Sequence, residues 1–148
     1  MSNDHDVSVL NGLIETTLDS VKGFSDAAED AEGSYTPSFS EMAQERSEVA
    51  SRLQALVSSL GGDPEAHSSY GAAAHRGFMN LKEAIMGRND RAVIEEVERG
   101  EDYLKTKYET ALEDTELSPQ AREAIELAFQ SVRKGHDRAS ALKHSIVA

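Results

Sequence analysis

Three residues with chemically active side chains interrupt the apolar helical stripes of this sequence: Arg46, Glu101 and His136. At about 100° per residue along a helix, each falls within the arc that its apolar neighbours define. All three lie near the middle of their segments, so they could share one layer of a helical core. Thr17 is the polar candidate on the first stripe. A charged side chain inside such a core layer needs an opposite charge beside it, because burying an unpaired ion costs a large desolvation energy.

We therefore expect an inner ion pair in which the Arg46 guanidinium binds the Glu101 carboxylate in a bidentate manner. His136 or Thr17 would then meet the remaining hydrogen-bonding capacity of the pair. In the alternative interpretation, Arg46, Glu101 or both extend along the apolar surface and place their charges in solvent at the edge of the core.

Other patterns that carry enzyme chemistry are missing from the sequence. It contains no cysteine, which excludes disulfides, thiolate catalysis and cysteine-ligated metals. It also has no Gly-rich phosphate loop, no Gly-x-Ser-x-Gly elbow and no His-Glu-x-x-His zinc motif. We expect no catalytic and no cofactor-binding residues.

The spacing of apolar residues predicts five helices within one domain that spans residues 1–148. Two of them should begin where a capping residue precedes a proline, at Thr36-Pro37 and at Ser118-Pro119. Gly61-Gly62 should end the second helix. The predicted ranges are about 6–31, 37–60, 68–86, 91–115 and 119–146.

The connections between these helices predict the topology. Short links join the first helix to the second and the fourth to the fifth, so each pair forms an antiparallel hairpin. The long link between the hairpins is itself helical and could span about 30 Å, which would make the second and fourth helices parallel. The predicted fold is all-α: a ferritin-like antiparallel four-helix bundle with a helical crossover between bundle helices two and three.

The segment from Phe39 to Ala50, Phe-Ser-Glu-Met-Ala-Gln-Glu-Arg-Ser-Glu-Val-Ala, resembles the second helix of the ferritin-like superfamily, which includes the rubrerythrins. Nearly the whole chain also resembles an uncharacterised bacterial family of ferritin-like four-helix-bundle proteins. The phrases that carry this second resemblance are Leu10-Asn-Gly-Leu-Ile-Glu-Thr, Met42-Ala-Gln-Glu-Arg, Leu60-Gly-Gly, His75-Arg-Gly-Phe-Met, Arg99-Gly-Glu-Asp and His136-Asp-Arg.

The superfamily resemblance implies a di-iron centre, but most of its ligand positions are replaced here. Arg46 and Val49 stand where the superfamily has the glutamate and histidine of Glu-x-x-His, and Thr17 stands at the position of the first glutamate. Glu101 matches the bridging glutamate. On the last helix only His136 of the second Glu-x-x-His remains. We expect no bound metal, with iron or manganese at Glu101 and His136 as the alternative.

The composition limits the partners. A net charge of −12 opposes general binding to nucleic acid, and no apolar run is long enough to cross a membrane. The absence of a signal peptide favours a cytoplasmic location. We expect a non-enzymatic protein with an interaction or stress-associated role and, by analogy, a homodimer. The alternative is a metal-binding oxidoreductase with a reduced site at Glu101 and His136.

Overall fold

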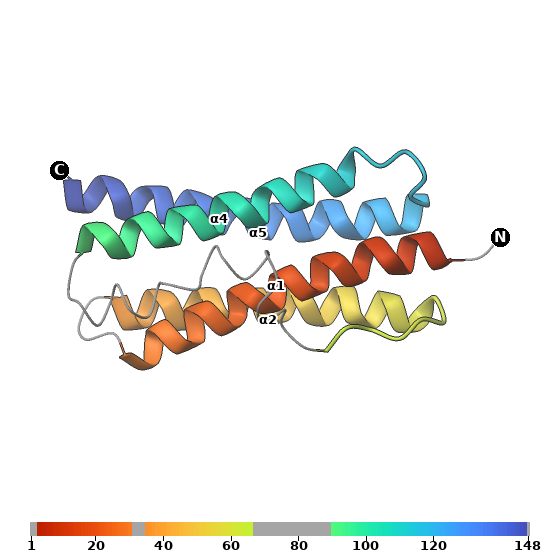
Figure 1. Cartoon of the computed structure of the whole chain (residues 1–148), viewed down its shortest axis with the longest axis horizontal. Coiled ribbons are helices and arrows are strands. Elements are labelled where there is room, and N and C mark those ends of the chain that lie inside the picture. Colours follow the sequence, from red (N-terminus) through yellow and green to blue (C-terminus); the bar gives the residue numbers. More distant parts are fainter. Residues whose placement is uncertain (1–2, 31–34, 67–89, 148) are drawn as a thin grey trace.

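The computed structural model consists of long α-helices arranged as a bundle (Figure 1). The structure describes residues 3–30, 35–66 and 90–147. Helices α1 (Asp4–Asp30) and α2 (Tyr35–Ser59) form one hairpin, and α4 (Asp90–Leu112) and α5 (Pro119–Val147) form the other. The prediction of an all-α bundle with four long helices is confirmed, and the predicted helix ends are close to those observed. The predicted crossover helix at 68–86 lies outside the described residues.

The helices stand at the corners of a square in which every neighbouring pair is antiparallel. Helix α2 packs against α1 and α5, and α4 packs against α5 and α1. Figure 1 shows that α2 and α4 run in one direction while α1 and α5 run in the other. Within the described ranges, α2 and α4 make no close backbone contact. They therefore occupy opposite corners, and only long side chains can join them.

A glycine pair ends α2, as predicted. Gly61 has a φ of 86°, a left-handed conformation that is easily reached only without a Cβ atom. The amide of Gly61 donates to the Ser58 carbonyl, and the amide of Gly62 donates to the Val57 carbonyl. These two bonds form a Schellman motif, which satisfies carbonyls that the end of the helix would leave free. A Cβ on Gly62 would lie 2.8 Å from Val7 of α1, so this glycine also allows α1 to approach closely.

Side chains of α1 hold the loops at the same end of the bundle. The side-chain amide of Asn11 donates to the Asp63 carbonyl at 2.9 Å and accepts from the Glu65 amide at 2.8 Å. The carboxylate of Asp6 accepts from the Ser118 amide at 3.0 Å. Ser118 in turn caps α5, because its hydroxyl accepts from the Ala121 amide. Helix α1 therefore holds both the loop that follows α2 and the α4–α5 loop at this end of the bundle.

The predicted start of α2 needs a small correction. The helix begins at Tyr35, so Pro37 is its third residue instead of its first. The first amides of a helix have no partner within it, and a proline therefore fits this position as well.

The core combines two apolar regions with a polar layer between them. One region is a cluster of buried residues from all four helices, and at the other end of the bundle the rings of Phe24 and Phe39 stack at 5.7 Å. The cluster contains Leu10, Leu13, Ile14, Val49, Leu53, Val57, Leu104, Tyr108, Ala111, Leu117, Ala121, Ile125, Ala128 and Val132. No helix in the described ranges is long and apolar enough to cross a membrane.

Candidate functional site

A charged pair lies in the middle of the bundle. Arg46 of α2 is 1% exposed and Glu101 of α4 is fully buried. A guanidinium nitrogen of Arg46, Nη2, donates to Oε2 of Glu101. The two side chains therefore span the diagonal between the two parallel helices, in the layer where the sequence analysis expected them. The alternative in which they extend into solvent does not agree with this burial.

The space for the guanidinium comes from a glycine on α5. A Cβ atom built on Gly135 would overlap Nη2 of Arg46 and would lie 3.1 Å from Oε2 of Glu101. Gly135 is itself buried, and Val132 on the same face is fully buried. Only a residue without a side chain fits between the ion pair and the α5 backbone. The sequence analysis overlooked Gly135, whose signal is a glycine inside an otherwise regular helical stripe.

The pair makes one strong contact and leaves two polar atoms unused. Among the described residues, Nη1 of Arg46 and Oε1 of Glu101 are buried without a hydrogen-bond partner. The expected bidentate geometry is therefore replaced by a contact through a single nitrogen and a single oxygen. This layer therefore holds one unused donor and one unused acceptor in a deeply desolvated position. This is unusual, because buried polar groups normally have hydrogen-bond partners.

A second polar contact lies beside the pair and joins α1 to α4. Thr17 donates through its hydroxyl to the Leu13 carbonyl at 2.7 Å and accepts from the Tyr108 hydroxyl at 2.8 Å. Burial raises the pKa of Tyr108 to about 12, although Thr17 and the nearby Arg46 charge act in the opposite direction. The phenol is thus a neutral hydrogen-bond donor at ordinary pH. Its place seven residues after Glu101, two helical turns on the same face, is the sequence signal for its membership of the cluster.

His136 does not belong to this cluster, and the prediction that it would is wrong. Its Nε2 lies 2.8 Å from Oδ1 of Asp102 on α4, and its side chain is 26% exposed. The face of α5 that meets Arg46 runs through Val132 and Gly135. A residue one position further is rotated by about 100°, which carries the His136 ring out to the α4–α5 edge.

Among the described residues, no group of three or more potential metal ligands gathers in the polar layer. Oε2 of Glu101 is taken by the guanidinium, and His136 is directed toward Asp102. A divalent cation at this place would also meet the positive charge of Arg46. Hard cations need several anionic oxygens to offset desolvation, and the pair offers one carboxylate that is already neutralised.

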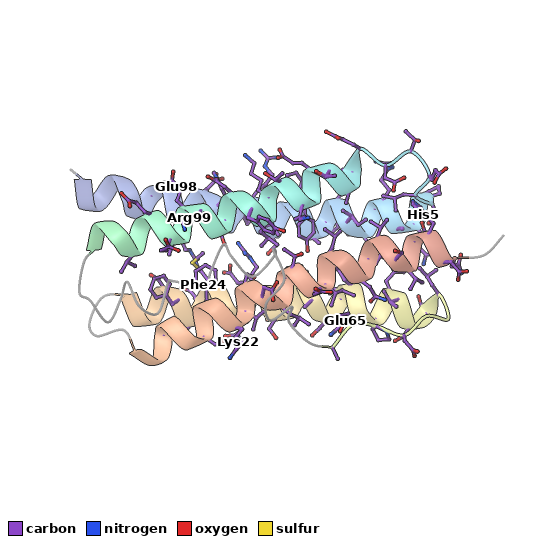
Figure 2. All side chains as sticks on the ribbon, in the orientation of Figure 1. His5, Lys22, Phe24, Glu65, Glu98 and Arg99 are labelled. Carbon is purple, nitrogen blue, oxygen red and sulfur yellow. The ribbon has the colours of Figure 1, made fainter. Side chains whose placement is uncertain are left out.

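One other group in the described part of the chain brings potential metal ligands together. His5, Asp114 and Glu116 place one ligand atom each within 4.8 Å of one another, at the end of the bundle where Figure 2 labels His5. Nε2 of His5 lies 2.7 Å from Asp114, and the other oxygen of that carboxylate accepts from the Glu116 amide. These bonds hold the α4–α5 loop against α1, and we interpret the group as a loop anchor.

A family model described as "Domain of unknown function (DUF2383)" matches residues 6–114. The matched range includes Thr17, Arg46, Glu101 and Tyr108, whereas Gly135 lies beyond it. A search among curated proteins found no significant match.

Proposed function

We propose that this chain, which belongs to the DUF2383 family, is a ferritin-like bundle without a metal centre that serves as a non-enzymatic interaction or stress-associated module. In this proposal the Arg46–Glu101 pair occupies the layer in which metal-binding relatives of the superfamily would hold two irons. The ion pair, fully desolvated and centred between the hairpins, is the observation that supports the proposal.

The pair fits a structural role better than a catalytic one. Buried ion pairs contribute little net stability, because the desolvation of both charges offsets their attraction. Their best attested use is to specify one arrangement of elements over others. Here the only direct partner of Arg46 in the described ranges belongs to the opposite hairpin, so a sliding of one hairpin along the other would separate the two charges.

The neighbouring groups also lack the properties of a catalytic site. A general acid or base works best with a pKa near the operating pH, whereas the pKa of Tyr108 is raised to about 12. The side chains of Arg46, Glu101 and Tyr108 are at most 1% exposed, so a substrate would have to displace packed helices to reach them. The arrangement can keep the two charges paired and fix the alignment of the helices within the core.

Metal analysis of protein purified without chelators, from cells supplied with iron and manganese, tests the proposal. We expect far less than one metal ion per chain. Bound metal at one or two ions per chain that is lost in Glu101→Gln would overturn the proposal and favour the oxidoreductase alternative. Glu109→Gln, the same change at an exposed residue of α4, is the matched control.

A further inference from the structure

A groove runs along the outer face of the bundle between α2 and α5, away from the buried ion pair. Its volume is about 640 Å³. Its floor is apolar and includes Val49, Leu53 and Ala128, which are buried. Charged residues of both helices line its sides, so the groove combines an apolar centre with polar edges. This is the anatomy of a protein–protein contact surface.

The charges on the two edges have opposite signs over most of the groove. Helix α2 contributes Glu45 and Glu48, and α5 contributes Lys134 and Arg138. Within the chain, Arg138 lies near two carboxylates of α2, at 3.8 Å from Glu41 and 3.6 Å from Glu45. Nη1 of Arg138, the nitrogen on the Glu41 side, is still a buried atom with no hydrogen-bond partner among the described residues.

Leu127 of α5 lines this groove and is 58% exposed. Within the described ranges it is the one large hydrophobic side chain that is exposed. A single exposed leucine is common on protein surfaces, but this one adjoins the apolar floor of a groove. Leu127 therefore adds exposed apolar surface to the buried floor of the groove, where a bound partner can contact it.

We propose that a second copy of this chain covers the groove and forms a two-fold symmetric dimer. The symmetry axis would run along the groove, parallel to α2 and α5. A half-turn about that axis places α2 of each copy over α5 of the other and keeps every residue at its own height along the bundle. Glu48 then faces the partner's Lys134, Glu45 faces the partner's Arg138, and the two Leu127 side chains pack over the facing floors.

The net charge of the chain favours this face over the other faces for contact between two copies. The whole chain carries −12, so most orientations of two copies bring like charges together. The residues that line the groove include Arg52, Lys134 and Arg138 against Glu45 and Glu48, which is three positive and two negative charges and a net of +1. A closed two-fold contact needs a self-complementary patch, and an acidic edge opposite a basic edge provides one.

Analytical ultracentrifugation across micromolar concentrations tests the proposal. We expect the wild-type chain to reach twice its mass of 16.1 kDa. Leu127→Ser should raise the dimer dissociation constant by about tenfold or more. A wild-type chain that stays monomeric throughout would overturn the proposal.

Paired charge reversals identify the face. Glu48→Lys alone and Lys134→Glu alone should each weaken the dimer, because each places like charges opposite one another. An equal mixture of the two variants should restore dimers, since both contacts of the mixed dimer then join opposite charges. Glu109→Lys, the same change on an exposed residue of α4 outside the groove, is the control. Dimers that none of these groove variants affects would contradict the assignment of this face.

Failure of this proposal would leave the proposed function unaffected. The dimer is judged by mass and the proposed function by metal content, and no residue of the groove belongs to the buried ion pair.

Discussion

The guanidinium of Arg46 lies in the space that a side chain on Gly135 would fill. One residue provides the charge that pairs with Glu101, and the other provides the space for it. The two residues come from different hairpins, so neither position can be understood from its own helix. This relationship leads to the first prediction, and the polar contacts around it lead to the others.

Gly135→Ala should destabilise the protein by about 1–3 kcal/mol, because the added methyl group overlaps a side chain that is fully buried and held by an ion pair. Gly12→Ala is the matched control, since a Cβ at Gly12 meets nothing within 4 Å. The control should be neutral or stabilising by up to about 1 kcal/mol, because alanine favours the helix. Urea denaturation measures both. Equal stability of the two variants would contradict the close packing described here.

Arg46→Met should cost about 3–5 kcal/mol, because it leaves the buried carboxylate of Glu101 without its counter-ion. The double variant Arg46→Met/Glu101→Leu should recover most of this loss, since it removes both charges. Denaturation of the two single variants and the double variant gives the coupling energy. Arg99→Met breaks an ion pair in which Arg99 is 57% exposed, and it should cost less than about 1 kcal/mol. Additive effects of the two core substitutions would contradict a direct pair.

Tyr108 should make the stability of the protein depend on pH in the alkaline range. Its pKa rises from 10.0 in the unfolded chain to about 12 in the folded protein. A raised pKa contributes stability that is fully present below pH 10 and is lost as the pH increases toward 12. Denaturation at increasing pH, compared between wild type and Tyr108→Phe, measures this contribution. The loss of stability over this interval should be smaller in the variant, and identical profiles would refute the assignment.

Asp114 should make the stability of the protein depend on pH in the acid range. There the stability falls as the pH decreases, whereas the Tyr108 contribution falls as the pH increases. The backbone bond that Asp114 accepts from Glu116 and its contact with His5 lower the pKa of the carboxyl below 3.8. A lowered pKa gives stability that is present above pH 3.8 and is lost as the pH falls through the folded value. Asp114→Asn should therefore reduce the stability difference between neutral and acid pH. Glu113→Gln changes an exposed neighbouring residue and should leave that difference intact.

The sequence predicted the parts of the fold that depend on local signals. Apolar periodicity placed the four described helices, and the glycine pair at Gly61 correctly marked the end of α2, where the left-handed backbone conformation needs a glycine. The same periodicity placed Arg46 and Glu101 inside the bundle. These features are encoded within single helices, so one sequence is enough to find them.

The details of the polar layer depend on contacts between helices and were harder to predict. His136 was assigned to the core because its spacing matches that of the apolar residues of α5. The face of α5 that meets Arg46 is centred one residue earlier, at Gly135. An error of one position rotates a helical side chain by about 100°. The contact of Thr17 with Tyr108 joins two different helices, and spacing along either helix does not reveal it.

The diagonal position of the ion pair has a kinetic consequence. Arg46 and Glu101 belong to different hairpins, and their helices make no close backbone contact in the described ranges. The two charges meet only when the hairpins dock, because one charge comes from each hairpin. We therefore expect loss of the pair to accelerate unfolding more than it slows folding.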